Sequence, residues 1–101
     1  MPTAIFCAND RMAIGVIHML RQRGIRVPED ISIVGLDDIE VATFLDPPLT
    51  TIRQSFADLA TRAVKTLLSI LKGEWPDPAQ VALEPVLVVR QSTTRLEGPS
   101  T

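Results

Sequence analysis

The sequence has few of the residues on which metal centres and disulfide frameworks depend. It contains one cysteine and one histidine in 101 residues. A single cysteine excludes an internal disulfide and a thiolate metal cluster, and a single histidine excludes a multi-histidine site. Glycine-rich phosphate loops, nucleophile elbows of the form G-x-S-x-G and metal-ligand spacings are also missing. The sequence therefore predicts no metal, no cofactor and no enzymatic activity.

Clusters of basic residues and long apolar runs are missing as well. The net charge is −2 and the ten Lys and Arg residues are scattered, so we expect no nucleic-acid binding by this segment itself. The apolar runs are too short to cross a bilayer, and the N-terminus lacks the features of a secretory signal. We therefore expect a cytoplasmic location without membrane contact.

The first half of the sequence follows a strand, helix, strand pattern. The run "TAIFCA" (residues 3–8) is typical of a strand and leads into Asn9 and Asp10, both preferred helix caps. Residues 11–23 favour a helix that ends at Gly24. The run "ISIVGL" (residues 31–36) lacks strict alternation, as in strands covered on both faces. This pattern predicts a right-handed βαβ unit with parallel strands.

The second half contains one clear helix between short extended segments. After an irregular stretch that ends in two prolines, residues 50–54 predict a brief crossing strand. Apolar residues then recur at helical spacing from Phe56 to Leu71. A loop at 74–80 follows, and residues 81–92 hold one or two short strands interrupted by Pro85. With so few strands, the chain is expected to be part of a larger α/β structure.

Polar residues follow both strands of the predicted βαβ unit. In an open parallel sheet, ligands bind beyond the carboxyl ends of the strands, so Asn9 and Asp10 should meet Asp37 and Asp38 at one rim. Amide and carboxylate groups suit hydroxyl-rich or amine-bearing small molecules. Two other interpretations stay open. Asn9 or Asp10 caps the helix in place of contacting a ligand. Because successive strand side chains point to opposite faces, Asp38 orders the following turn and only Asp37 contacts the ligand.

Two other residues have more than one interpretation. Phe56 is as compatible with packing in a core as with stacking against a ligand. His18 lies on a helix that is more apolar than one sheet face requires, and we interpret it as packed or facing a partner rather than binding a ligand.

The sequence resembles the LacI family of transcriptional repressors. The segments "AIFCANDRMAIGVI", "GIRVPEDISIVGLDDIE" and "PPLTTIRQSF", in this order and spacing, resemble the C-terminal part of that family's effector-binding domain. The segment "VLVVRQST" resembles its closing strand. One departure is Leu36, where the family commonly has an aromatic residue. Periplasmic sugar-binding proteins share the fold, but the "VPEDIS" and "PPLTTIRQ" segments favour the repressors.

The resemblance implies a type I periplasmic-binding-protein-like fold, which has two lobes with parallel sheets and is incomplete in this chain. Residues 1–92 would form a C-terminal fragment of the effector-binding domain. Within it, residues 2–52 would belong to the C-terminal lobe, residues 53–85 mostly to the N-terminal lobe, and residues 86–92 would return to the first. Residues 93–101 are expected to be a flexible tail.

The resemblance also implies roles for single residues. Asn9, Asp37 and Phe56 would contact or line the pocket of a small-molecule effector, usually a sugar or a nucleobase-like compound. A homodimer interface would contain residues from the first helix and from the segment after the second strand, namely Ile14, Ile17, His18, Phe44 and Leu45.

The expected function is therefore that of a fragment of a ligand-responsive transcriptional regulator. Operator DNA would be bound only through a helix-turn-helix domain that these residues lack. The alternative is a stand-alone or periplasmic-type sugar-binding module without a regulatory role.

Overall fold

The computed structural model describes residues 1–75 and 83–96, which fall into two compact units. The larger unit comprises Met1–Arg53 together with the segment from Leu87, and the smaller unit is Gln54–Val86. The chain thus leaves the larger unit after Arg53 and returns to it at Leu87.

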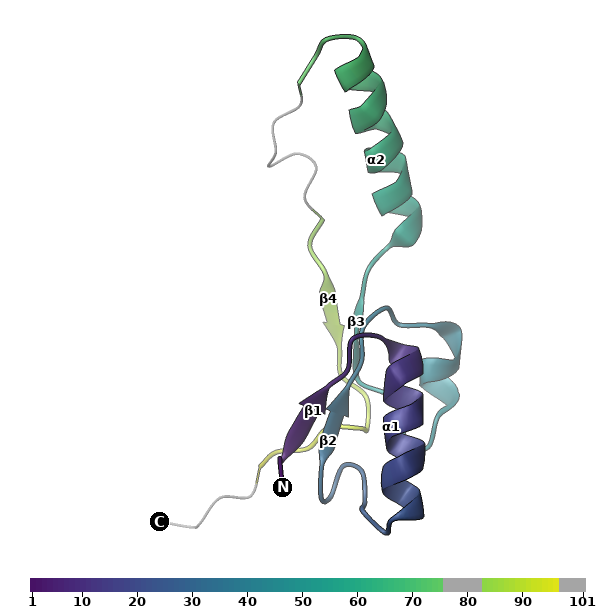
Figure 1. The fold of residues 1–101 in the computed structure, drawn as a ribbon, viewed down its shortest axis with the longest axis vertical. Coiled ribbons are helices and arrows are strands. Elements are labelled where there is room, and N and C mark those ends of the chain that lie inside the picture. Colours follow the sequence, from purple (N-terminus) through teal and green to yellow (C-terminus); the bar gives the residue numbers. More distant parts are fainter. Residues whose placement is uncertain (76–82, 97–101) are drawn as a thin grey trace. The chain divides into compact units, whose positions relative to one another are not determined.

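The larger unit is built on a parallel βαβ arrangement, as the sequence predicts (Figure 1). Strand β1 (Ala4–Phe6) is followed by helix α1 (Asp10–Gln22) and strand β2 (Ser32–Val34). The two strands pair in parallel, with Ile5 opposite Ile33 at the centre of the register. The carboxyl ends of both strands consequently lie at the same edge.

Local sequence signals set both ends of α1. The Asn9 side chain caps the helix, because its Oδ1 accepts a hydrogen bond of 2.8 Å from the backbone N–H of Met12. The capping interpretation of Asn9 is therefore confirmed. At the other end, Gly24 adopts a φ of +73°, a conformation that glycine enters without steric cost.

The segment after β2 contains a short helix that the sequence pattern did not reveal. A 3-10 helix, η1, spans Glu40–Phe44 inside the stretch that we expected to be irregular. Its Ala42 is fully buried, and the carbonyl of Ala42 accepts a hydrogen bond from the N–H of Leu49. Five residues are too few for apolar periodicity to appear in a sequence, which explains the difference.

Two further strands carry the chain out of the larger unit and back. Strand β3 (Thr51–Arg53) pairs with β4 (Val86–Val88) in a second two-stranded sheet. Isolated parallel bridges, Val34 with Thr50 and Asp37 with Arg53, also attach the β3 segment to the end of β2. The predicted crossing strand at 50–54 is confirmed, and the outgoing and returning segments lie together.

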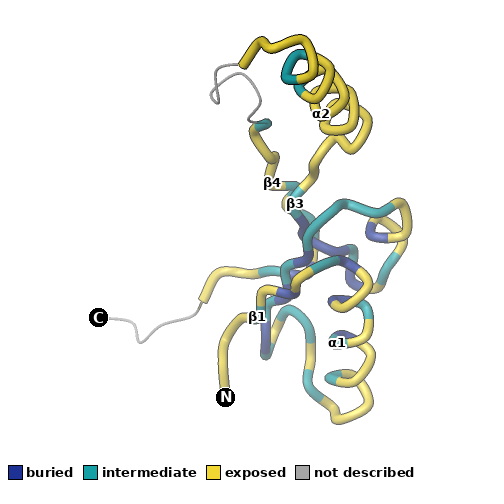
Figure 2. The backbone as a smooth tube through the Cα atoms, turned by 45° about the horizontal axis from the view of Figure 1, so that its top comes forward, coloured by how far each residue is buried: buried dark blue, intermediate teal, exposed yellow. Residues whose placement is uncertain are grey.

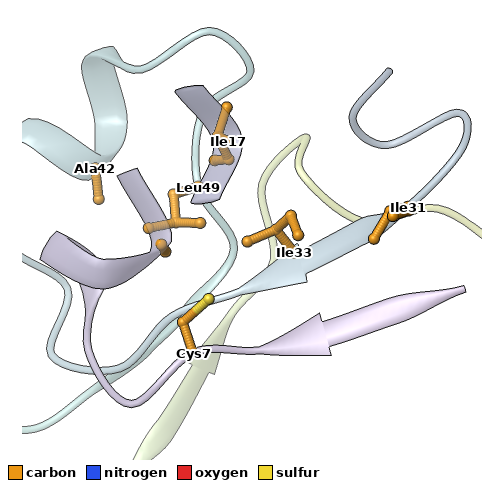
Figure 3. Close-up of a cluster of buried hydrophobic side chains, with 7 residues drawn as sticks. Cys7, Ile17, Ile31, Ile33, Ala42 and Leu49 are labelled. Carbon is orange, nitrogen blue, oxygen red and sulfur yellow. The ribbon is translucent and has the colours of Figure 1, made fainter. Parts of the chain in front are cut away.

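A small apolar core fills the space between α1, β2 and the segment around Leu49 (Figures 2 and 3). Its buried members are Cys7, Ala13, Ile17, Ile31, Ile33, Ala42 and Leu49. Burial raises the pKa of the Cys7 thiol, which fits a residue that packs as a small apolar group. This core supports the loops that follow β1 and β2.

The smaller unit is described over its helix α2 (Phe56–Leu71) and short flanking segments. Ser55 caps the helix by accepting a hydrogen bond from the N–H of Asp58, and Gly73, with a φ of +83°, follows its last turn. The predicted helix is confirmed, although none of its residues is buried. Most of the loop predicted at 74–80 and the first two residues of the segment predicted at 81–92 lie outside the described residues, and β4 is the strand that the structure shows in that segment.

Candidate functional site

The loops that follow β1 and β2 meet at the carboxyl edge of the sheet. The N–H of Cys7 donates to the carbonyl of Val34 at 2.8 Å, and the N–H of Asp10 donates to the carbonyl of Leu36 at 2.9 Å. These bonds place Asn9 and Asp37 on neighbouring loops. The convergence expected from the parallel pattern is therefore present.

Asp10 is the buried anchor of this rim. Its side chain has no solvent exposure, and its Oδ2 accepts a hydrogen bond of 2.9 Å from the N–H of Ile39. Its Oδ1 accepts a bond of 2.6 Å from the hydroxyl of Thr51. A buried carboxylate is costly unless its oxygens are hydrogen-bonded, and both are. The sequence pattern indicates Asp10 as a possible cap or as part of the polar rim, so its role as a buried anchor was missed.

Two neighbouring residues fit around the Asp10 carboxylate. The Thr51 hydroxyl that donates to Asp10 also accepts a hydrogen bond of 3.3 Å from the N–H of Asp38. Gly35 packs so closely that an added Cβ would overlap the carboxylate oxygen of Asp10 and approach Leu49 at 3.1 Å. The carboxylate therefore connects the start of α1, the start of η1 and β3.

Asp37 is held at the rim by its backbone. Its N–H donates to the carbonyl of Ile52 at 2.9 Å, and its φ is +119°. Asp38 follows with a φ of +59°. Non-glycine residues at positive φ cost free energy, and such strain clusters at ligand-binding sites. Asp37 is only half-buried, so its carboxylate lies at a partly open edge rather than in the core.

Asp38 joins two arginines from distant parts of the sequence. Its Oδ2 accepts a hydrogen bond of 2.8 Å from Nε of Arg53, and its Oδ1 accepts one of 2.7 Å from Nη2 of Arg90. Desolvation of the carboxylate raises its pKa, but the hydrogen bonds and charges of the two arginines outweigh this effect and hold the pKa of Asp38 below its usual value. The interpretation of Asp38 as a residue that orders the turn agrees with these contacts.

The returning segment is bonded to the strands through its hydroxyl groups. The fully buried Ser92 donates from Oγ to the carbonyl of Ile33 at 2.6 Å and accepts from the N–H of Thr50 at 2.7 Å. The next two residues, Thr93 and Thr94, are also hydrogen-bonded, to Thr50 and Ser32. The tail expected from residue 93 thus begins with two bonded residues, and its flexibility stays a prediction.

Phe56 is the one predicted effector residue that belongs to the smaller unit. It is the first residue of α2, and 56% of its surface is exposed. Its role in an effector pocket stays a prediction, as does its alternative role in a core.

Four of the five residues expected at a dimer interface line one groove of the larger unit. Ile14, Ile17, His18 and Leu45 line a shallow groove of about 160 Å³ together with Arg21 and Asp46. Ile17 has most of its side chain in the core, whereas His18 is exposed and Phe44 is 78% exposed. The assignment to an interface stays a prediction.

Two negative findings concern the described part of the chain. Residues 1–75 and 83–96 contain no group of three or more His, Cys, Asp or Glu side chains that could hold a metal ion. None of the described helices has the length and apolarity needed to cross a membrane.

The parallel βαβ unit with a polar rim at the carboxyl ends of its strands is typical of α/β proteins that bind ligands at this edge of the sheet. Residues 1–93 match the family described as "Periplasmic binding protein-like domain". The chain belongs to this family, and the fold class expected from the sequence is confirmed.

Known relatives of the chain are LacI-type regulators, as the sequence motifs predicted. The ribose operon repressor of Haemophilus influenzae is 45% identical over 95% of this chain and 29% of its own length. Among solved structures, the Lac repressor dimer bound to operator and the anti-inducer ONPF has a TM-score of 0.79 at 38% identity, covering 93% of this chain and 32% of that one. A LacI family regulator from Enterococcus faecium with bound ribose has a TM-score of 0.78 at 34% identity, covering 94% and 35% of the two chains. The chain therefore spans about a third of the length of these proteins.

The close fit of Gly35 against Asp10 leads to a stability prediction. Replacing Gly35 by Ala forces a methyl group against a buried carboxylate and should lower the free energy of unfolding by about 1–3 kcal/mol. Gly15→Ala is the matched control, because Gly15 lies in α1 and the methyl group of an alanine there would have no atom within 4 Å. That variant should be neutral or stabilising by up to about 1 kcal/mol. Urea unfolding followed by circular dichroism measures both, and equal effects would contradict the described contact.

The arginine contacts of Asp38 lead to a pH prediction. Since its pKa is lower in the folded than in the unfolded chain, its stabilisation is complete above the unfolded value of about 4 and is lost as the pH falls through the folded value. Urea unfolding of the chain and of Asp38→Asn from pH 7 to pH 3 measures this contribution as the difference between the two curves. The difference should shrink as the pH falls below about 4. A difference that is independent of pH would contradict the assignment.

Proposed function

We propose that this chain is the C-terminal part of the effector-binding domain of a LacI-type transcriptional regulator. The observation that carries the proposal is the rim at which Asn9 and Asp37 lie on adjacent loops, in a chain whose relatives include the ribose operon repressor. In such a regulator, effector binding changes operator affinity because the two binding sites are thermodynamically linked. Operator DNA is bound by a domain outside these residues.

In the proposed regulator the larger unit belongs to the C-terminal lobe and the smaller unit to the N-terminal lobe. Residues 2–52 and 86–92 belong to the C-terminal lobe, and residues 53–85 belong mostly to the N-terminal lobe. The division of the chain into units after Arg53 and before Leu87 supports these boundaries.

The proposed effector is a polar small molecule, either a sugar or a nucleobase-like compound. Asp37 accepts hydrogen bonds from the effector, and the half-buried position of its loop makes such charge-assisted bonds stronger than in open water. Asn9 uses Oδ1 as the helix cap, so its contact to the effector is made through the side-chain NH₂ group. Phe56 supplies an apolar face from the other lobe. A bound ribose in the related regulator from Enterococcus faecium supports the sugar class.

A stand-alone sugar-binding module is the second candidate, and an enzyme the third. The identity to repressors over nearly the whole chain favours the regulator over the module. No catalytic role is proposed, because the polar residues of the rim are accounted for by capping, anchoring and ligand contact. The proposed location is the cytoplasm, where operator DNA is found.

The effector site yields a test in a full-length regulator that carries this sequence. Asp37→Ala removes charge-assisted hydrogen bonds worth about 1.5–3 kcal/mol each, so the Kd for the effector should rise by at least about tenfold. Affinity for operator DNA without effector should stay unchanged. Calorimetric titration with ribose and other sugars, and operator binding measured by fluorescence anisotropy, provide the two readouts.

The control for Asp37→Ala is Glu74→Ala, which removes an exposed carboxylate of the smaller unit. It should leave the effector Kd unchanged. An Asp37→Ala protein that binds and responds to effector like the parent would contradict the proposed site.

The proposed regulator is a homodimer that uses the groove lined by Ile14, Ile17, His18 and Leu45, with Phe44 beside it. An exposed phenylalanine next to an apolar groove is the type of residue that interfaces bury. The dimeric Lac repressor among the structural relatives supports this assembly.

A charged residue at Phe44 tests the dimer. Because 78% of Phe44 is exposed within the chain, Phe44→Glu should leave the fold intact while weakening the dimer by about 2 kcal/mol or more. Sedimentation equilibrium of the full-length regulator measures this as a rise of at least about thirtyfold in the dimer Kd. Leu96→Glu, at another exposed apolar residue, should have no effect. Equal behaviour of both variants would exclude the proposed interface.

A further inference from the structure

The Asp38 carboxylate links the loop after β2 that contains Asp37, here called the Asp37 loop, to both segments that connect the two units. Asp38 directly follows Asp37 in sequence. Its partner Arg53 is the last residue before the chain leaves the larger unit, and its partner Arg90 follows β4 where the chain has returned. One side chain therefore contacts the outgoing and the returning segment at once.

The contact of Asp38 with Arg90 is well shielded from solvent, and its contact with Arg53 is partly exposed. The side chain of Asp38 is 10% exposed and that of Arg90 is 15% exposed, whereas Arg53 is 57% exposed. Arg90 is held further by a hydrogen bond of 2.9 Å from Nη1 to the carbonyl of Leu49 and by one of 2.9 Å from its N–H to the hydroxyl of Thr50. Shielded, charge-assisted hydrogen bonds of this kind are stronger than exposed ones and fix geometry.

The backbone around Asp38 is attached to the same segment. The N–H of Asp37 donates to the carbonyl of Ile52 and the N–H of Asp38 to the hydroxyl of Thr51, both in the β3 segment. Asp37 and Asp38 both have positive φ, so the loop needs such contacts to persist in this conformation. The two arginines supply them through the carboxylate.

We infer that Asp38 is a positioning residue for the effector site: it fixes the Asp37 loop by clamping Arg53 and Arg90, and thereby connects that loop to both chain crossings. The inference rests on the proposed function, in which Asp37 contacts the effector. A shift of the Asp37 loop on effector binding is then transmitted directly to the segments that lead to the other unit.

A matched ion pair elsewhere in the larger unit provides the control. Arg26 donates to Asp30 through Nε and Nη2, at 3.2 and 3.0 Å, and its side chain is 69% exposed. This pair resembles the Arg53–Asp38 pair in chemistry but lies in the turn before β2, away from the Asp37 loop. Arg53→Gln and Arg26→Gln therefore remove comparable ion pairs at two different places.

The test is backbone amide hydrogen exchange, followed by NMR on the 101-residue chain without effector. Arg53→Gln should accelerate exchange at the amides of Asp37 and Arg90 by about tenfold, with exchange at Ala13 in α1 unchanged. Arg53→Lys, which keeps the charge, should recover most of the protection. Arg26→Gln should leave the Asp37 and Arg90 amides as they are.

Asp38→Asn weakens the contacts with both arginines. It should therefore increase the exchange rates of the Asp37 and Arg90 amides more than Arg53→Gln does. Should that variant fail to fold, the Arg53 series decides, because Arg53 is largely exposed. Equal exchange at Asp37 in Arg53→Gln and Arg26→Gln, or uniform acceleration across the larger unit including Ala13, would overturn the inference. Since no effector is added, a sugar screen that fails would count against the proposed function and not against the clamp.

Discussion

The larger unit depends on one buried carboxylate that is fully hydrogen-bonded. Asp10 accepts from the N–H of Ile39 and from the hydroxyl of Thr51, and in doing so connects α1, η1 and β3. These segments are distant in sequence, and a buried charge without such partners would cost several kcal/mol. Gly35 is required because a side chain there would occupy the space of the carboxylate. The apolar core and the rim above it are both arranged around this contact.

The two consecutive aspartates at the end of β2 have separate roles because of this arrangement. Asp38 turns to Arg53 and Arg90 and is nearly buried, while Asp37 stays half-buried at the partly open edge. Charge at the end of this strand is therefore tolerated in two ways, by pairing with arginines and by partial exposure at the edge of the sheet. The proposed effector contact at Asp37 and the proposed clamp at Asp38 follow from this difference.

The sequence predicted what depends on local patterns and missed what depends on distant partners. The βαβ unit, the Asn9 cap and α2 follow from apolar periodicity and capping residues, which act within a few positions. The role of Asp10 as a buried anchor was missed because its partner Thr51 is 41 positions away. The contact of Asp38 with Arg90 was missed because the two residues are 52 positions apart. Position after the strand and family resemblance both point to Asp37, and the resemblance points to the interface residues; these roles stay predictions. Neither pattern nor resemblance indicates which carboxylate is buried.

The proposed regulator binds its effector at the rim formed by the loops after β1 and β2. The decisive measurement is an NMR titration of a full-length regulator carrying this sequence, labelled in its backbone amides, with ribose and a panel of related sugars. We expect saturable shifts at the amides of Asn9 and Asp37 for the sugar that is bound. Saturable binding with shifts confined to the opposite end of the strands, around Arg26 and Asp30, would contradict an effector site at this rim.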